Sequence, residues 1–263
     1  MKTSNDDRAA QLREKTASRA KSGYVKSVAL LNPRGLRSRE RLKEAAREVL
    51  NEKGYHSLRV QDITERAGAA NGLYYRYFHD LREIVAEISS DFFDELIKTS
   101  ATLEVADDPY NWIYRNHHNV VSLFAQNPGI LACLFGLAGD YEEFDAIWKR
   151  NAHEWNLQVA GFLQVRAGFE RSHAERMGFV LGAITEGVIY QALIRRTEDL
   201  FEFGSEPKDI AETIAVMWYR AIFLENPPVH VLGETGRHLA GEDAEHDSDE
   251  KSVASPESKT QGR

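Results

Sequence analysis

The segment from Gly68 to Asp80, GAANGLYYRYFHD, brings an amide, phenols and a guanidinium into one short stretch. On a helix, Asn71, Tyr75 and Arg76 point away from the face that Tyr74 and Phe78 form. Amide and guanidinium groups hydrogen-bond to base edges in a major groove, and guanidinium and phenol groups also bind phosphates. These three residue types therefore predict a surface for nucleic acid.

The other side of the same helix is apolar. Tyr74 and Phe78 lie four residues apart, with Tyr77 beside them, which is typical of a face packed on a core. Asn71 has two interpretations, since an asparagine at the start of a helix either reads a base or caps the helix. The segment predicts a helix with one packed face and one exposed face.

Neighbouring segments position this helix. A first helix is expected at about residues 38–53 and a second at about 59–67, followed by the glycine-containing turn 67–70. A longer helix is expected from Asp80, a plausible N-cap, to Leu103. Two short helices joined by a tight turn and stacked on a preceding helix are the layout of a helix-turn-helix, here at about 59–78.

The rest of the chain shows helical spacings and no clear strand alternation, so the fold class is predicted as all-α. Further helices are expected at about residues 110–126, 128–138, 140–167, 172–197 and 207–225. The predicted organisation is a flexible basic arm at 1–35, a DNA-binding domain at 36–98, a helical domain at 99–225 and a disordered acidic tail at 226–263.

Charge is distributed unevenly along the 263 residues. Residues 1–85 contain 18 Lys and Arg against 11 Asp and Glu, whereas the remainder contains 15 against 30. The basic end is suited to a polyanion, and the acidic body would be repelled by one. The basic arm could lie along phosphates or enter a minor groove, or it could serve only as a solubilising tail.

The run from Arg39 to about Ile97 resembles the DNA-binding domain of the TetR (tetracycline-repressor-like) transcriptional regulators. The resemblance is carried by Glu52-Lys53-Gly54-Tyr55, Asp62-Ile63, Glu65-Arg66-Ala67-Gly68 and Gly72-x-x-Tyr75-x-Tyr77-Phe78. It covers about 60 residues, and the acidic helical remainder is similar in architecture to the family's ligand-binding and dimerisation domain. The resemblance implies a homodimeric repressor that a small molecule releases from a double-stranded DNA operator.

The resemblance and the residue types together give the candidate DNA contacts Arg59, Asn71, Tyr75, Arg76, Tyr77 and Arg82. The sequence departs from the family pattern at three places. Leu73 replaces a small hydroxyl residue, Asp80-Leu81-Arg82 replaces Ser-Lys-Glu, and Arg59 replaces a threonine or serine. Arg82 could substitute for the absent lysine from the neighbouring position.

Two late segments carry apolar stripes that could form a four-helix dimer interface. Their residues are Met177, Leu181, Ile184, Val188, Ile210, Ile214, Met217 and Ala221. Small residues beside the first stripe would let another helix approach closely. The alternative is that both stripes pack only within one chain.

Nine aromatic residues lie between residues 110 and 155, a density that could line a pocket for a small apolar or aromatic effector. The candidates are Trp112, His117, Phe124, Phe135, Trp148 and Trp155. Ordinary core packing is the alternative for each of them. Acidic residues between 142 and 154 could favour a cationic ligand, although such residues usually form solvated faces.

Several classes of site are not expected. The histidines and Cys133 lack metal-ligand spacing, and no nucleophile elbow, phosphate loop or dinucleotide loop is present. We therefore expect no metal, no cofactor and no enzyme activity. A single cysteine, an N-terminus without an apolar core, and a longest apolar run confined to 129–139 indicate a cytoplasmic protein without a membrane span.

The leading hypothesis is a ligand-responsive transcriptional regulator. The alternative is a helical small-molecule-binding or scaffolding protein whose helix-turn-helix no longer binds DNA. Leu73 and the missing lysine favour this alternative, and the basic balance of residues 1–85 argues against it.

Overall fold

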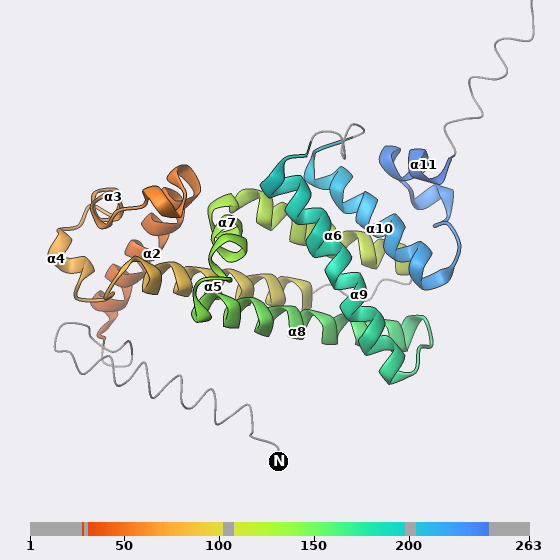
Figure 1. Cartoon of the computed structure of the whole chain (residues 1–263), viewed down its shortest axis with the longest axis horizontal. Coiled ribbons are helices and arrows are strands. Elements are labelled where there is room, and N and C mark those ends of the chain that lie inside the picture. The colour runs from red at the N-terminus through yellow and green to blue at the C-terminus, as the bar shows by residue number, and fades with distance from the viewer. Residues whose placement is uncertain (1–27, 29–30, 102–107, 198–203, 242–263) are drawn as a thin grey trace, which may run out of the picture. The chain divides into compact units, whose positions relative to one another are not determined.

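The computed structural model is built of helices, and no strand occurs in the part of the chain that it describes (Figure 1). The all-α prediction is confirmed there. The predicted basic arm lies almost wholly outside the described residues, as does the end of the predicted acidic tail. The structure describes residue 28 and residues 31–101, 108–197 and 204–241.

The chain divides into two compact units, one made of residues 1–99 and 123–155 and the other of residues 100–122 and 156–263. The first division lies beside the predicted boundary at residue 98. However, residues 123–155, which the sequence assigned to the second domain, group with the helix-turn-helix unit. The division falls within two helices, α6 and α8, because a continuous helix can contribute its two ends to different cores.

The first unit contains the helix-turn-helix and the helices that support it. Its complete elements are α2 (Pro33–Lys53), the 3-10 turn η2 (Tyr55–Ser57), α3 (Val60–Arg66), α4 (Asn71–Tyr74) and α7 (Pro128–Leu137). Most of α5 (Leu81–Ala101) and parts of α6 (Pro109–Gln126) and α8 (Glu142–Arg166) also belong to it. The predicted order of short helices is therefore confirmed.

Helix α2 begins earlier than expected, because its first turn is well capped. The backbone N–H of Gly35 donates to the Asn32 side-chain oxygen at 2.9 Å, and Pro33 occupies the first helical position. Proline is tolerated there since its missing N–H would be unpaired anyway. The prediction that residues up to 35 form a flexible arm is wrong for Pro33 to Gly35.

Helix α7 packs directly on α2 through a close backbone approach. A Cβ atom at position 129 would collide with the carbonyl group of Leu50, so only glycine fits at Gly129. The Gly129 N–H donates to the Asn51 side-chain oxygen at 2.9 Å. The side chains of Leu42, Ala46 and Leu50 on α2 are buried and belong to the apolar core of this unit.

The second unit is built on α9 (Arg171–Ile189), the π-turn η3 (Tyr190–Arg195) and α10 (Pro207–Phe223), with the N-terminal part of α6 and the C-terminal part of α8. A buried polar chain links three of its helices. His117 Nδ1 lies 2.7 Å from the Ile113 carbonyl oxygen and therefore donates to it. His117 Nε2 accepts from the Thr185 hydroxyl at 3.2 Å, and that hydroxyl oxygen accepts from the Trp218 indole N–H at 3.1 Å. Each step of this chain satisfies a buried polar group.

The prediction of disorder from residue 226 onward is wrong for the described residues, since η5 (Val229–Val231) and α11 (Glu234–Ala240) lie there. Helix α10 holds α11 at both ends. The buried Glu212 carboxylate accepts from Tyr110 Oη at 3.3 Å and from the backbone N–H of Gly233, at the start of α11. Arg220 donates to the Leu239 carbonyl oxygen at 2.7 Å, at the end of α11. An anion at the N-terminus and a cation at the C-terminus both stabilise a helix dipole.

The neutral state of His117 makes this unit sensitive to acid. Complete burial lowers the pKa of His117 to about 4, below its value of 6.5 in the unfolded chain. The unfolded chain therefore binds a proton more tightly, and stability falls as the pH drops from 6.5 towards 4. We expect the titration of His117 to lower the unfolding free energy by about 2 kcal/mol when the pH falls from 7 to 5. Urea titrations at the two pH values measure this difference.

A His117→Gln variant keeps a hydrogen-bonding side chain but cannot be protonated, so its stability should depend less on pH. His118→Gln, which changes an exposed histidine on the same helix, is the matched control. Equal pH dependence in wild type and His117→Gln would contradict the prediction.

Candidate nucleic-acid interface

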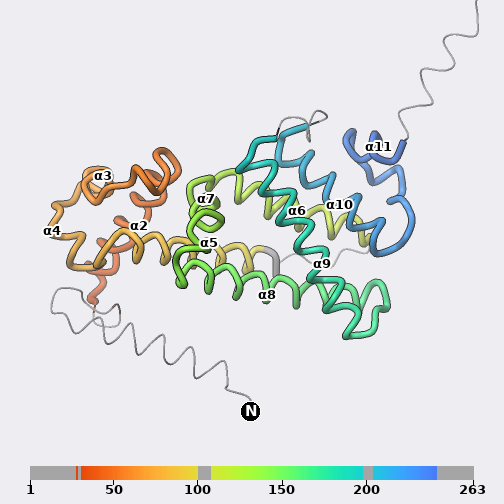
Figure 2. The backbone as a smooth tube through the Cα atoms, in the orientation of Figure 1, coloured from red at the N-terminus to blue at the C-terminus, as the bar shows by residue number. Residues whose placement is uncertain are grey.

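Helices α3 and α4 are joined by a tight turn, whose backbone path is traced in Figure 2. Gly68 has a φ of 59°, in the left-handed region that glycine adopts without steric cost. The Ala69 N–H donates to the Thr64 carbonyl oxygen at 2.8 Å, which closes the end of α3. This geometry is that of a helix-turn-helix, as the sequence predicted.

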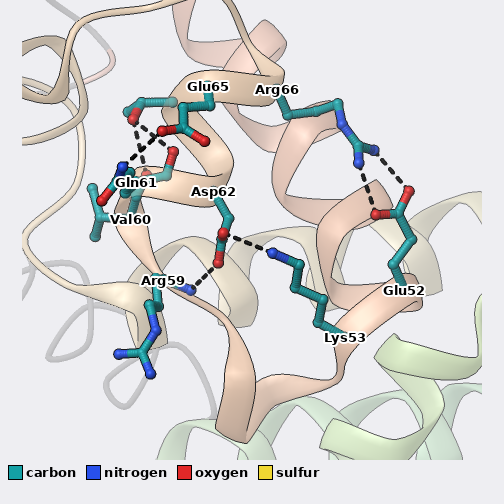
Figure 3. A network of polar contacts seen from close by, with 9 residues as sticks. Glu52, Lys53, Arg59, Val60, Gln61, Asp62, Glu65 and Arg66 are labelled. Atoms are coloured by element: carbon teal, nitrogen blue, oxygen red, sulfur yellow. Dashed lines mark hydrogen bonds and ion pairs between the residues drawn. The ribbon is translucent and has the colours of Figure 1, made fainter.

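Charged side chains fasten α3 to α2 (Figure 3). Arg66 pairs with Glu48 at 2.8 Å and with Glu52 at 2.7 Å, and Lys53 pairs with Asp62 at 2.7 Å. Hydrogen bonds from Arg66 lower the pKa of Glu52, and the hydrogen bond from Lys53 lowers the pKa of Asp62. The cationic groups of Arg66 and Lys53 are thus already paired with carboxylates of the same domain.

The Asp62 carboxylate also accepts a hydrogen bond from the backbone N–H of Arg59 at 3.2 Å, and this bond caps the start of α3. The Arg59 guanidinium extends away from this network in Figure 3 and forms no ion pair with a described residue. Its position is compatible with the predicted phosphate contact.

Helix α4 ends at Tyr74, so the predicted helix continues as a turn, but the predicted division into buried and exposed side chains is present. Tyr74 and Phe78 are fully buried, whereas Tyr75 is 49% exposed and Arg76 is exposed. Tyr77 is only 5% exposed and packs mainly in the core, so its role as a DNA contact stays a prediction.

Asn71 is exposed at the first position of α4, and Ala70 occupies the N-cap position without a side-chain hydrogen bond. The N-cap interpretation of Asn71 is therefore wrong. The Asn71 side-chain oxygen instead accepts from the Thr64 hydroxyl. This contact with α3 fixes the amide and leaves its NH₂ group for another acceptor.

The surroundings of the Arg82 side chain do not favour the phosphate contact that the sequence predicted. Its guanidinium lies 3.4 Å from Asp80 and 3.8 Å from Glu143, and 5.1 Å over the centre of the Tyr141 ring. The charge of Asp80 is the main cause that raises the pKa of Arg82. Two carboxylates already neutralise this cation, so it is poorly placed to attract a phosphate. The sequence signal for this pairing was the adjacent Asp80.

Helix α2 carries several arginines, of which the sequence assigned only Arg34 to the flexible arm. Arg39 is buried and pairs with Glu87, and its guanidinium lies 4.7 Å over the Phe78 ring. Arg34, Arg37 and Arg41 are exposed on the same helix. Their spacing of three and four residues indicates one face of a helix, and this signal was available in the sequence.

The candidate effector residues belong to separate groups of rings. In the second unit, Trp112 stacks on Phe162 with ring centres 4.0 Å apart, and His117 lies in the polar chain described above. The four others belong to the first unit. Phe124 contacts Phe92 and Phe93, and Trp148 contacts Phe93 and Phe135. Trp155 is half-buried at the end of this unit.

The candidate dimer residues are divided between core and surface. Leu181, Ile210 and Ile214 are buried within the chain, so they cannot form a free face and the packing alternative holds for them. Met177, Val188 and Ala221 are half-buried. Ile184 and Met217 are 42% and 45% exposed.

The sequence missed two further exposed apolar side chains of α9, Phe179 and Val180. Among the described residues, the continuous helical segment Arg171–Arg195 is long and apolar enough to cross a membrane. Only 22% of its most apolar 18-residue stretch is buried. In the described residues, no group of three or more His, Cys, Asp or Glu side chains is placed to hold a metal ion.

The profile of the family described as bacterial regulatory proteins, tetR family, matches residues 42–88. An uncharacterized HTH-type transcriptional regulator, YdgC, from Bacillus subtilis (strain 168) is 32% identical over 73 residues, which are 28% of this chain and 37% of YdgC. The HTH-type transcriptional repressor DhaR from Mycobacterium sp. (strain GP1) is 36% identical over 72 residues, which are 27% of this chain and 36% of DhaR. The matched segment thus spans about a third of these curated relatives.

Solved structures extend the likeness of fold beyond this segment. A transcriptional regulator from Rhodococcus sp. superposes with a TM-score of 0.60 at 18% identity, covering 73% of this chain and 99% of its own. A putative transcriptional regulator from Saccharomonospora viridis, solved in complex with choline, has a TM-score of 0.56 at 16% identity, covering 70% and 96%. At these identities the structures establish a shared fold.

The buried hydroxyl of Tyr74 supports the position of α4. It donates to the Asp80 carbonyl oxygen at 2.9 Å, and burial raises its pKa far above the usual range. Tyr74→Phe leaves that carbonyl without its partner and should lower the unfolding free energy by about 1 kcal/mol. Tyr75→Phe alters the exposed neighbouring phenol and is the matched control. Urea denaturation measures both, and equal stabilities of the two variants would refute the role of this hydrogen bond.

Proposed function

We propose that this chain, whose DNA-binding domain belongs to the TetR family of bacterial regulatory proteins, is a transcriptional regulator that represses by binding an operator as a homodimer. The observation that carries the proposal is the geometry of residues 71–78, which form α4 and the turn after it. Tyr74 and Phe78 are buried there, and Asn71, Tyr75 and Arg76 are exposed to solvent. The name of the similar protein DhaR, a repressor, supports repression over activation.

In this proposal, the N-terminal part of α4 enters the major groove, where the Asn71 amide and the Tyr75 phenol meet base edges. One such helix covers only half of a symmetric site. A second copy of the chain would place its α4 in the next major groove, about 34–36 Å away.

The surface of α9 supports a homodimer. Phe179 is 65% exposed, and Val180 and Ile184 continue its apolar stripe, with Met217 exposed on α10. Gly187 leaves room for close approach of another helix. An apolar helix with so little burial within its own chain is suited to packing against a second copy.

A small apolar or aromatic effector would bind among the candidate aromatic residues, four of which belong to the first unit and two to the second. Helix α5 follows the helix-turn-helix directly in the sequence, so a shift of α5 on effector binding would change the spacing of the two α4 helices. A coupling free energy of about 1–3 kcal/mol is enough for release. Choline, which is bound to the similar S. viridis protein, is a first effector to test.

Specific DNA binding tests the proposed function. Fluorescence anisotropy on the DNA upstream of this protein's own gene, beside a scrambled duplex, should show preference for the former. Tyr75→Ala should weaken the specific complex by about 1–3 kcal/mol, because it removes a base-edge contact, and should change scrambled binding little. Leu157→Ala, at a position 48% exposed outside the helix-turn-helix, is the control.

The proposal of a transcriptional regulator would be rejected if wild type bound both duplexes with equal affinity and a selection from random DNA then enriched no sequence. The helical small-molecule-binding or scaffolding protein would then be the remaining hypothesis.

A dimer through α9 also predicts a specific mutational effect. Ile184→Glu puts a carboxylate into the proposed apolar interface and should convert a species of twice the 29.8 kDa chain mass into the single chain. Val165→Glu, at an exposed apolar position on α8, should leave the dimer intact. Analytical ultracentrifugation measures the masses. A wild-type monomer, or an Ile184→Glu dimer, would contradict this interface.

A further inference from the structure

A hollow of about 780 Å³ lies between the N-terminal half of α2 and helix α4. Four of its lining residues are arginines, Arg34, Arg37 and Arg41 from α2 and Arg76 from the turn after α4. Leu73 and Tyr77 line it from the α4 side. The hollow therefore adjoins the exposed face that we propose for base recognition, and its chemistry is strongly cationic.

These four arginines differ from other cations of the same unit. Arg39, Lys43, Lys53, Arg66 and Arg82 each have a carboxylate within 4.0 Å. None of the four arginines around the hollow forms an ion pair with a described residue. Guanidinium groups that converge without a carboxylate repel one another, and a bound anion would relieve that repulsion.

Two of the arginines also lie where a helix disfavours positive charge. Arg34 and Arg37 are in the first two turns of α2, and its first turn contains no acidic residue. The N-terminus of a helix carries a partial positive charge, so cations there destabilise it and anions stabilise it. This placement is unfavourable for folding alone and favourable for an anion held beside the helix.

The spacing of the α2 arginines fits a row of anions. Residues 34, 37 and 41 lie on one face, and a rise of 1.5 Å per residue separates the first and last by about 10 Å. One strand of B-DNA carries a phosphate about every 3.4 Å along the duplex axis. The row is thus long enough to contact two or three successive phosphates of one strand.

We infer that this hollow binds backbone phosphates of the operator, beside the groove that α4 enters, and that Arg76 contacts phosphate rather than a base. The inference rests on the proposed function and assigns the partner of this site. Its guanidinium groups would position the duplex, while Asn71 and Tyr75 would supply the sequence preference.

The test is the salt dependence of DNA binding by the full chain. Anisotropy titrations use the upstream duplex and a scrambled duplex of equal length over a series of KCl concentrations. Each arginine changed to glutamine should reduce the slope of log K against log[KCl] by about 0.9 and weaken binding roughly fivefold to tenfold at 0.1 M salt. The variants are Arg34→Gln, Arg37→Gln, Arg41→Gln, Arg76→Gln and the triple variant of the three α2 positions.

The two duplexes separate phosphate contacts from base contacts. All four single variants should bind both duplexes more weakly and by the same factor. The ratio of the two affinities should therefore stay within about twofold of the wild-type ratio. A loss confined to the upstream duplex in Arg76→Gln would overturn the assignment of Arg76 to phosphate. Arg115→Gln removes an exposed arginine of α6 that forms no ion pair with a described residue, and it should change neither slope nor ratio.

An unchanged slope in the triple variant would overturn the inference while wild-type DNA binding, and with it the proposed function, still stood. If inorganic phosphate then raised the melting temperature of wild type and not of the triple variant, the hollow would hold a free anion instead. Absence of wild-type binding to either duplex would reject the inference and the proposed function together. Circular dichroism of each variant checks that α2 remains helical.

Discussion

The structure of the first unit depends on holding a four-residue helix in place. A helix as short as α4 has too few internal hydrogen bonds to be stable alone. Its position is fixed from outside, by the burial of Tyr74 and Phe78, by the hydrogen bond of the Tyr74 hydroxyl to the Asp80 carbonyl, and by the contact of Thr64 with Asn71. The supporting helices therefore determine where the exposed side chains of α4 point.

Charge in this unit is divided between two tasks. The carboxylates Glu48, Glu52 and Asp62 pair with cations and fix α3 on α2. Because these carboxylates already pair with Arg66 and Lys53, they do not form ion pairs with the arginines around the hollow. The arginines around the hollow therefore lie together beside α2 and α4, where a polyanion would meet them.

The sequence predicted the helix-turn-helix, the all-α class and the two faces of α4, because these follow from local spacing and from a turn glycine. It missed features set by contacts between distant residues. Helix α11 is short and follows two prolines, so nothing local predicts it, and Glu212 and Arg220 of α10 stabilise it. The neutralisation of Arg82 by Glu143 and the burial of Leu181, Ile210 and Ile214 are likewise tertiary effects. An apolar stripe in a sequence does not say whether it packs inside the chain or outside it.

The backbone contact between Gly129 and Leu50 has a mechanical meaning. Where side chains separate two helices, rotamer changes can absorb a small displacement of one of them. Here the main chains of α7 and α2 touch without a side chain between them, so that compliance is absent at the point of contact. A displacement of α7 would therefore move α2 by nearly the same amount, and the two helices would behave as one rigid body.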